Sequence, residues 1–288
     1  MKWLEITVTT AREAAEAVCD ILLASRGGGV AEDAAPPGLA RLRGYLPAGP
    51  AAEASVAAIT SSVRALGRFG LDPGPAAVEV REIEDEDWAH AWKAHFKPFA
   101  VGRLWITPTW DRSPPPEGAV VVEIDPGMAF GTGLHPSTQM CLDVLDARVR
   151  GGERVFDVGT GSGILAIAAA KLGAASVLAR DDDPVAVAVA RSNAAYNRAA
   201  DRVTVEEGDL LAGVRDQADA VLANLTAGAH LVFLPRARPA LRPRGWLAAS
   251  GIVAPRLAAV EAASREAGFT VLQILESGEW RCLVLGAE

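Results

Sequence analysis

The stretch that decides the fold is Val155-Phe156-Asp157-Val158-Gly159-Thr160-Gly161-Ser162-Gly163. It predicts a strand over 155–158 that runs into a turn with three glycines spaced as GxGxG, followed by a helix. Glycine lets the backbone adopt positive φ and approach a ligand closely, and the start of a helix presents free N–H groups. The dinucleotide-binding pattern GxGxxG would need glycine at position 164, where this chain has Ile164. The turn therefore favours a ligand without a pyrophosphate.

An acidic run, Asp181-Asp182-Asp183-Pro184, follows the glycine turn. In sheets of this kind, a carboxylate about 20 residues after the glycines holds the hydroxyls of a ribose. Asp181 comes 22 residues after Gly159 and just past an expected strand, so it is the predicted ribose ligand. Proline prefers the first position of a helix, which makes Asp183 the predicted N-cap and leaves Asp182 at the surface. Together, the GxGxG turn and Asp181 favour S-adenosylmethionine as the ligand.

Strands and helices alternate from about residue 150 onward. The strands are expected at 155–158, 176–179, 203–206, 220–223 and 246–249, and the helices at 164–172, 184–195, within 225–241 and near 255–267. Two last strands, at 270–275 and 281–285, flank Ser277-Gly278 and form a hairpin. The pattern predicts a Rossmann-like α/β domain over 98–288, with a doubly wound, mostly parallel sheet and an antiparallel element at its end.

The N-terminal part of the chain has a different pattern. Strands are expected at 3–9, 28–32, 40–46 and 77–83, with one helix after Thr10 and another over 51–69. Thr10 and Glu13 have the spacing of a capping box, in which two side chains satisfy free N–H groups at a helix start. The order β-α-β-β-α-β predicts a small ferredoxin-like α+β domain over 1–83. In the next segment, 84–97, Trp88 and Trp92 share one face of a predicted connecting helix.

A second glycine-rich segment, 125–138, precedes the decisive stretch. It combines three glycines with an aromatic ring and several hydroxyls, among them Phe130, Thr132 and Thr138. Loops of this composition often close over ligands, so the segment is predicted to cover the cofactor. His135 within it is expected to be a turn histidine rather than a catalytic base.

Asn224 stands at the end of an expected strand, where doubly wound folds place their chemistry. Its side chain could accept a hydrogen bond from a substrate amine; it could also cap the following helix, and the two roles can coexist. Asp157 has two interpretations of equal weight, because it could steady the glycine turn or face the cationic methionine end of the cofactor. Four later arginines are interpreted as partners of a helix dipole rather than as an RNA contact: Arg236, Arg238, Arg242 and Arg244.

The composition favours a cytoplasmic protein that does not depend on nucleic acid. Lys plus Arg number 28 and Asp plus Glu 36, so the formal charge is −8 and bulk attraction to phosphate is not a driving force. A basic protein or a cationic ligand suits this charge better. The isolated Cys19, Cys141 and Cys282 favour a reducing compartment and support neither disulfides nor a metal site. The longest apolar run is short of the roughly 20 residues of a membrane span, so no membrane association is expected. We also expect a monomer, because nothing in the sequence demands an oligomer.

With these motifs in place, the chain resembles the bacterial methyltransferases of large-subunit ribosomal protein L-eleven over nearly its whole length. The most specific match is Asp125-Pro126-Gly127-Met128-Ala129-Phe130-Gly131-Thr132-Gly133-Leu134-His135-Pro136-Ser137-Thr138. Further matches are Glu86-Asp87-Trp88 with Trp92, Phe96-Lys97-Pro98, Arg103-Leu104-Trp105-Ile106, 157–165, Ala223-Asn224-Leu225 and Ser250-Gly251-Ile252. Arg43-Gly44-Tyr45-Leu46-Pro47 is a less specific match to the recognition domain of that family.

The resemblance implies a class I methyltransferase domain behind an N-terminal domain that grips the ribosomal protein. It implies methyl transfer from S-adenosylmethionine to the N-terminal α-amine and to lysine ε-amines, with S-adenosylhomocysteine as product and no metal. Carried over by position, the cofactor contacts fall on Thr138, Gly159, Asp181 and Asn224. The chain departs from the family at Leu134, where threonine is usual, at Thr226, where an apolar residue is usual, and in the polar run 180–183.

The expected reaction is an in-line displacement, in which the lone pair of a neutral amine attacks the methyl group of the sulfonium. A lysine amine has an ordinary pKa of about 10.4 and must first lose a proton, which an apolar channel favours. Asn224 is expected to orient the neutral amine. The alternative is an S-adenosylmethionine-dependent methyltransferase that acts on another protein or on a small amine. Ile164 disfavours a dehydrogenase, and a ribosome-assembly binding module without turnover is the remaining class.

Overall fold

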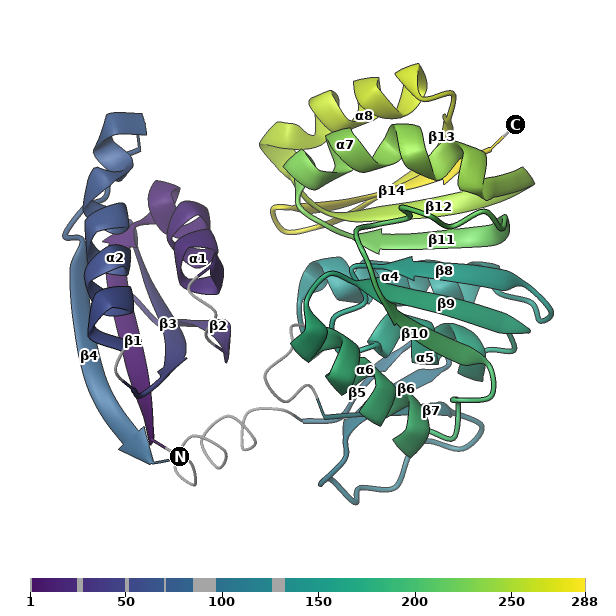
Figure 1. Ribbon diagram of the computed structural model, residues 1–288, viewed down its shortest axis with the longest axis horizontal. Helices are drawn as coiled ribbons and strands as arrows, with labels where there is room; N and C mark the ends of the chain where they lie inside the picture. Colours follow the sequence, from purple (N-terminus) through teal and green to yellow (C-terminus); the bar gives the residue numbers. More distant parts are fainter. Residues whose placement is uncertain are drawn as a thin grey trace. The chain divides into compact units, whose positions relative to one another are not determined.

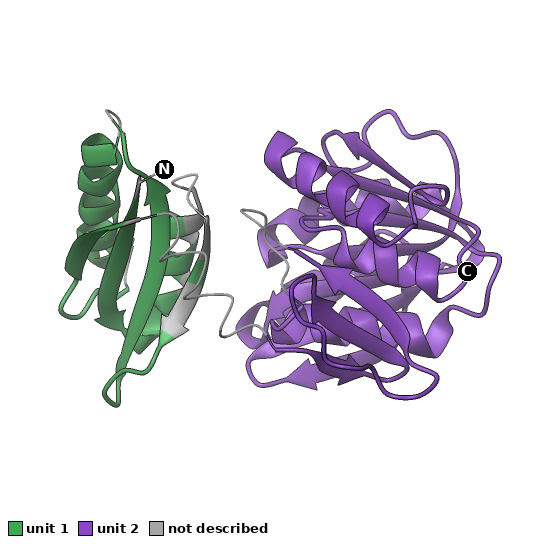
Figure 2. Cartoon of the chain, turned by 90° about the horizontal axis from the view of Figure 1, so that it is seen from below, with its two compact units in different colours: residues 1–96 green, residues 97–288 purple. Residues whose placement is uncertain are grey.

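The structure is a computed structural model that describes residues 2–24, 28–49, 52–69, 71–84, 97–125 and 133–287. The chain forms two compact units, residues 1–96 and residues 97–288 (Figure 2). The connecting helix expected over 84–97, with Trp88 and Trp92, lies outside the described residues except at its two ends. None of the helices in the described ranges is both long and apolar enough to cross a membrane.

The first unit is a four-stranded antiparallel sheet with two helices. In chain order its elements are β1 (Lys2–Ala11), α1 (Ala15–Ala24), β2 (Gly28–Asp33), β3 (Leu39–Pro47), α2 (Ala52–Ala65) and β4 (Ala77–Glu84). The strands lie in the order β2-β3-β1-β4 (Figure 1). This arrangement confirms the predicted ferredoxin-like fold.

The core of this unit follows from the sequence periods of its elements. Alternate residues of a strand point to one face, and Ile6 and Val8 of β1 are fully buried on that face. The two helices place Val18 and Val63, among others, in the same hydrophobic cluster. Each helix therefore buries its apolar face against one side of the sheet.

The predicted capping box at the start of α1 is wrong. Thr10 lies inside β1, and its Oγ1 donates a hydrogen bond to the carbonyl of Pro73 over 3.0 Å. Glu13 accepts a hydrogen bond from the backbone N–H of Asp72 over 2.7 Å. Both side chains hold the loop that leads into β4, and the short 3₁₀ helix Arg12–Ala14 precedes α1 without a side-chain cap.

The second unit is built on a seven-stranded sheet. Its strands are β8 (Arg154–Val158), β9 (Ser176–Asp181), β10 (Val203–Glu207), β11 (Ala218–Asn224), β12 (Leu241–Val253), β13 (Thr270–Ser277) and β14 (Trp280–Gly286). They lie in the order β10-β9-β8-β11-β12-β14-β13, and the first five are parallel. The hairpin of β13 and β14 pairs antiparallel with β12. The predicted doubly wound, mostly parallel sheet with an antiparallel end is therefore confirmed.

Helices cover both faces of this sheet (Figure 1). The helices α4 (Pro136–Arg148), α5 (Ile164–Lys171) and α6 (Pro184–Tyr196) share one hydrophobic cluster with it, and α7 (Ala227–Ala237) and α8 (Leu257–Glu266) share another. Short 3₁₀ helices follow α7, at Arg238–Ala240, and precede α8, at Ala254–Arg256. Consecutive residues of β8 serve the two layers: Val155 packs in the first cluster and Phe156 in the second.

A small second sheet was not predicted. It contains β5 (Phe99–Val101), β6 (Leu104–Pro108) and β7 (Val120–Ile124), with β5 antiparallel and β7 parallel to β6. Its buried residues, such as Ile106 and Val122, join the cluster around α5. Residues 164–170 of α5 are all buried, because this helix lies between the large sheet and the small one. A helix enclosed in this way is apolar on every side.

The parallel strands bring three predicted site positions to one edge. β8 ends at Val158 directly before the glycine turn, β9 ends at Asp181, and β11 ends at Asn224. Because β9, β8 and β11 are neighbours in the sheet, their carboxyl ends meet at the same edge. This is the edge at which doubly wound sheets bind ligands.

Candidate functional site

The glycine turn after β8 needs its glycines. Gly159, Gly161 and Gly163 have φ of 71°, 53° and 82°, which is the left-handed region that other residues rarely adopt. A Cβ added to Gly159 would lie 2.6 Å from Cδ2 of Leu225, the residue after β11. The GxGxG turn therefore packs directly against the end of the neighbouring strand.

Asp157 stabilises this turn through hydrogen bonds. It is buried, and its Oδ2 accepts hydrogen bonds from Oγ1 of Thr160 over 2.6 Å and from the backbone N–H of Ala166 over 3.0 Å. Of the two interpretations of Asp157, the structure shows the one in which it steadies the turn. Burial raises the pKa of this carboxyl to about 7. Its Oδ1 is buried without a hydrogen-bond partner among the described residues.

Asp181 connects the end of β9 to the glycine turn. Its Oδ2 accepts a hydrogen bond from the backbone N–H of Gly161 over 2.9 Å, and its Oδ1 accepts one from Asp183 over 3.1 Å. Burial raises the pKa of this partly buried carboxyl. Asp183 is the N-cap of α6, as predicted, because its Oδ1 accepts from the backbone N–H of Val185 over 2.8 Å. Asp182 is exposed, as expected.

Thr138 and Asn224 lie side by side at the same edge. Nδ2 of Asn224 donates a hydrogen bond to Oγ1 of Thr138 over 3.1 Å. Thr138 is buried in the first turn of α4, whereas Asn224 is half-buried at the end of β11. The alternative in which Asn224 caps α7 is wrong, because the N-cap is Thr226, whose Oγ1 accepts from the backbone N–H of Ala229 over 3.3 Å.

His135 has a structural role in this edge. It is the N-cap of α4, and its Nδ1 accepts a hydrogen bond from the backbone N–H of Ser137 over 3.3 Å. Its ring meets the ring of Trp280 edge to face, with centroids 4.5 Å apart. Burial lowers its pKa, which favours the neutral ring. These contacts agree with the expectation of a turn histidine.

The predicted cofactor-covering loop is described only at its ends. Phe130 and Thr132 lie outside the described residues. At the end of the loop, Gly133 has a φ of 81°, and a Cβ there would lie 2.6 Å from Cδ1 of Ile164. Gly133 therefore packs tightly against Ile164, the first residue of α5.

Asn193 is a site residue that the sequence analysis missed. It is buried, and its Nδ2 donates to the carbonyls of Asp125 and Ser162, each over 2.9 Å. Its Oδ1 accepts from the backbone N–H of Asp125 over 3.1 Å. Asn197, one turn later, makes the same pair of bonds to Glu123. Two asparagines four residues apart, one in the last turns of the expected helix and one at its end, were the available signal.

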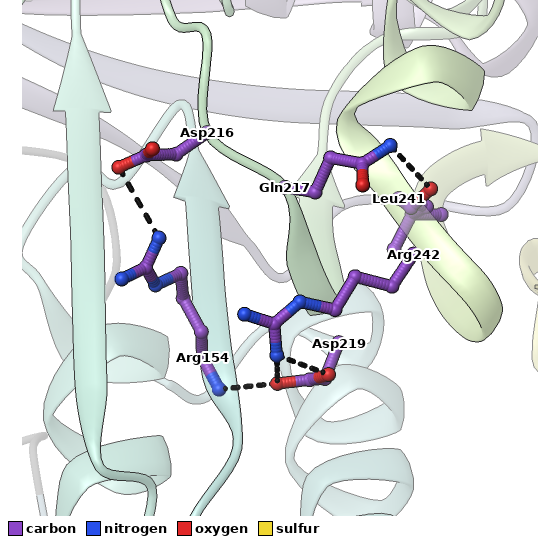
Figure 3. Close-up of polar contacts among 6 residues, drawn as sticks. All are labelled: Arg154, Asp216, Gln217, Asp219, Leu241 and Arg242. Atoms are coloured by element: carbon purple, nitrogen blue, oxygen red, sulfur yellow. Dashed lines mark hydrogen bonds and ion pairs between the residues drawn. The ribbon is translucent and has the colours of Figure 1, made fainter.

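Three of the four arginines between 236 and 244 have side-chain contacts within the protein, and the fourth, Arg244, donates its backbone N–H to the carbonyl of Ala287 over 2.7 Å. Arg236 pairs with Asp209 over 3.4 Å, and Nε of Arg238 donates to the carbonyl of Gly268 over 3.1 Å. Nη1 of Arg242 lies 2.8 Å from both carboxylate oxygens of Asp219 (Figure 3). The structural interpretation therefore agrees with these contacts, and Arg236 and Arg238 lie in the last turns of α7 and of the 3₁₀ helix that follows it.

Asp219 in turn joins three neighbouring strands at the opposite edge of the sheet. Asp219 lies near the start of β11 and binds the guanidinium of Arg242, which lies near the start of β12. It also accepts a hydrogen bond over 2.8 Å from the backbone N–H of Arg154, the first residue of β8 (Figure 3). The Arg154 guanidinium pairs with Asp216 over 3.2 Å. This network is remote from the glycine turn, because it lies at the amino ends of the strands.

No three His, Cys, Asp or Glu side chains in the described ranges gather closely enough to hold a metal ion. The described side chains and backbone groups that meet at the carboxyl edge are carboxylates, hydroxyls, amides and N–H groups. Five predicted positions lie within it: Thr138, Gly159, Gly161, Asp181 and Asn224.

The chain is similar to known proteins along its whole length. The family model described as ribosomal protein L11 methyltransferase (PrmA) matches residues 2–288. The ribosomal protein L11 methyltransferase of Heliobacterium modesticaldum is 42% identical over 307 residues, which cover 99% of this chain and 97% of that protein. The protein of the same name from Pelotomaculum thermopropionicum is 43% identical over 307 residues, covering 98% of each.

A solved structure agrees with these relatives. The crystal structure of ribosomal protein L11 methylase from Lactobacillus delbrueckii subsp. bulgaricus is 34% identical and superposes with a TM-score of 0.63. The superposition covers 67% of this chain and 99% of the Lactobacillus chain. The fold of the second unit is therefore that of a class I methyltransferase. Its glycine turn, carboxylate and strand-end asparagine stand in a chain that matches the family model almost from end to end, and the chain belongs to the ribosomal protein L11 methyltransferase family.

Proposed function

We propose that this protein transfers methyl groups from S-adenosylmethionine to amines of ribosomal protein L11, both the N-terminal α-amine and lysine ε-amines. The observation that carries the proposal is the meeting of the GxGxG turn, Asp181 and the Asn224–Thr138 pair at one edge of the sheet. The names of the similar proteins support the same activity and the same substrate.

The residues of the edge fit this cofactor. S-adenosylmethionine supplies a methyl group made electrophilic by a positively charged sulfur. Each carboxylate oxygen of Asp181 accepts one bond within the protein, and a carboxylate has about four acceptor positions, which leaves room for ribose hydroxyls. The left-handed glycines Gly159 and Gly161 allow close approach of the backbone, and Oγ1 of Thr138 lies against Asn224 at the same edge.

Asn224 is the residue proposed to handle the amine. Its Nδ2 is held by Thr138, which fixes the amide plane and leaves Oδ1 as an acceptor. A neutral amine that donates one hydrogen to this Oδ1 has its lone pair directed away from it, toward the methyl group for in-line displacement. The contribution of the protein is then positioning and exclusion of water rather than proton transfer. No general base is assigned, since the amine deprotonates when apolar surroundings lower its pKa.

The first unit is proposed to recognise the ribosomal protein, with 1–83 as the recognition domain, 84–97 as the linker and 98–288 as the catalytic domain. The formal charge of −8 suits a basic protein partner. A cytoplasmic location and a monomeric state remain predictions.

The experiment that tests the proposal is intact-mass spectrometry of ribosomal protein L11 after incubation with the enzyme and S-adenosylmethionine. We expect mass gains in steps of one methyl group, and no gain with the Asn224→Ala variant. If the wild-type enzyme binds S-adenosylhomocysteine but leaves L11 unmodified, the substrate is wrong and another protein or a small amine takes its place. If it binds no cofactor, the proposed activity fails altogether.

A further inference from the structure

Ser250 connects the two halves of the Asn224–Thr138 pair. It lies opposite Asn224 in the parallel pairing of β11 and β12 and is fully buried. Its carbonyl accepts a hydrogen bond from the backbone N–H of Leu225 over 3.1 Å, next to Asn224. Its hydroxyl donates to the carbonyl of Ser137 over 2.9 Å, next to Thr138. One residue of β12 therefore sets the positions of both partners.

His230 gives the carbonyl of Ser250 a second hydrogen-bond donor, besides the backbone N–H of Leu225. Its Nε2 lies 2.8 Å from that oxygen, and its side chain is fully buried. A carbonyl oxygen can only accept, so Nε2 carries the hydrogen and donates it. Burial lowers the pKa of His230 to about 4, so the ring is neutral near pH 7. His230 thus provides a fixed, uncharged donor to the connecting residue.

The backbone around this contact has little freedom. Gly251, directly after Ser250, has a φ of 82°, and a Cβ there would lie 2.4 Å from the carbonyl oxygen of Leu225 and 3.0 Å from Oδ1 of Asn224. On the other side, the backbone N–H of His230 donates to the carbonyl of Thr226 over 3.1 Å in the first turn of α7. A shift of the Ser250 carbonyl would therefore also displace the adjacent Asn224 side chain.

We infer that His230 is a positioning residue for methyl transfer: through the carbonyl of Ser250 it fixes the Asn224 side chain against Thr138. The inference rests on the proposed function, because it assigns the effect to the amine-orienting group of the same site. His230 itself does not contact the amine or the cofactor in this assignment. It acts through the backbone of Ser250 and Leu225, both of which interact with its ring.

The test compares His230→Phe, which keeps an aromatic ring but has no donor, with His230→Gln, whose amide nitrogen can donate. One buried hydrogen bond is worth up to about a tenfold change in an equilibrium or a rate. We expect His230→Phe to lower kcat for L11 methylation about tenfold at saturating cofactor. His230→Gln is expected to recover kcat to within about threefold of the wild type. A role in packing alone would not distinguish these two variants by kcat.

Phe233→Leu is the matched control. Phe233 is fully buried on the same helix and packs only in an apolar cluster. This variant should lower the melting temperature without changing kcat measured well below that temperature. A second pair tests the connecting residue itself. Ser250→Ala keeps the carbonyl that His230 holds but removes the bond to Ser137, whereas Ser264→Ala removes a buried hydroxyl whose partner is the local carbonyl of Glu261. Only Ser250→Ala should lower kcat.

Hydrogen–deuterium exchange tests the role of His230 without requiring methyl transfer, so its result does not depend on the proposed function. The backbone N–H of Leu225 should exchange with deuterium faster in His230→Phe than in Phe233→Leu, because only the first variant frees the Ser250 carbonyl. Equal exchange in the two variants, a wild-type kcat in His230→Phe, or no recovery in His230→Gln would overturn the inference. If the wild type does not methylate L11, the proposed function fails while the exchange experiment still decides the role of His230.

Discussion

The side chains of Asn224 and Thr138 form a hydrogen bond of 3.1 Å between residues that lie 86 positions apart in the chain. Asn224 comes from the end of a central strand, and Thr138 from the first turn of a helix on one face of the sheet. The contact joins the proposed amine-orienting amide to a proposed cofactor contact. It is therefore the place to test whether the two positions act together.

A double-mutant cycle on this pair should show coupling. Asn224→Ala and Thr138→Val should each weaken binding of S-adenosylhomocysteine, and the double variant should lose less than the sum, with a coupling of about 1 kcal/mol. Titration calorimetry gives the four affinities, those of the wild type, the two single variants and the double variant. Thr107→Val is a control, because Thr107 is a buried threonine whose hydroxyl has only a local backbone partner. Strictly additive losses would show that the hydrogen bond carries no energetic link.

Asp181→Ala should weaken cofactor binding by tenfold or more. The variant loses the proposed ribose acceptor and also the bond that holds the backbone of Gly161. Hydrogen bonds to a charged group are each worth about 1.5–3 kcal/mol, so at least this loss is expected. The neighbouring Asp182→Ala, on an exposed residue of the same run, should keep the wild-type affinity. Equal affinities for both variants in calorimetry would remove Asp181 from the cofactor site.

Asp157 should make the stability of the apo-protein depend on pH. Its pKa is raised from 3.8 to about 7 in the folded state, mainly by burial. The fold therefore favours the protonated carboxyl, and this contribution is full below the unfolded pKa and is lost as pH rises through about 7.

Urea unfolding of the wild type and of Asp157→Asn, at about pH 5 and about pH 8, measures this effect. The free energy of unfolding of the wild type, relative to the variant, should be larger at the lower pH. Since the other titrating groups are shared by both proteins, their contributions cancel in the comparison. A difference that stays constant with pH would mean that Asp157 does not titrate between these values.

Asp219→Ala should destabilise the protein and leave catalysis unchanged. The variant removes a carboxylate that joins Arg154 and Arg242 at the edge of the sheet opposite the proposed site (Figure 3). Since the Asp219 and Arg242 side chains are 33% and 46% exposed, solvent screens the pair, and a loss of about 1–2 kcal/mol is expected. Asp216→Ala, on a more exposed partner of Arg154, should cost less than about 1 kcal/mol.

The pH dependence of Asp219 has the opposite sign to that of Asp157. Burial alone would raise the pKa of Asp219, but the bonds from Arg154 and Arg242 and their charges hold it below its ordinary value. Its stabilisation is therefore present above the unfolded pKa of about 3.9 and is lost as pH falls through the lower folded value. In urea unfolding, the gap between wild type and Asp219→Ala should narrow in acid. A gap that widens there would contradict the assignment.

The sequence predicted correctly those parts of the fold that depend on residues close together in the chain. The GxGxG turn, the Asp183 cap and the alternation of strands and helices all depend on residues a few positions apart. The three strands at 99–124 were missed because they are short and belong to a second sheet that only packing against α5 makes visible. The helix α4 was missed because it is buried on several sides, including polar Ser137 and Thr138, and so lacks a simple apolar stripe.

Long-range partners explain the remaining differences. The pattern of Thr10 and Glu13 is that of a capping box, but the partners of both side chains, Pro73 and Asp72, come from a loop about 60 residues later in the chain. The contacts of His230 and Asn193 depend in the same way on strands that only the folded sheet brings near. A buried polar side chain in an apolar helix signals that such a partner exists without saying which it is.

The position of β14 in the sheet has a consequence for the order in which the protein can be completed. β14 follows β13 in the chain but lies between β12 and β13 in the sheet. During synthesis, β13 emerges before the only strand with which it pairs, and the edge of β12 stays open until residues 280–286 have left the ribosome. A nascent chain that stops at residue 279 would lack Cys282, Leu283 and Leu285 from its core, so the edge next to Ser250 forms last.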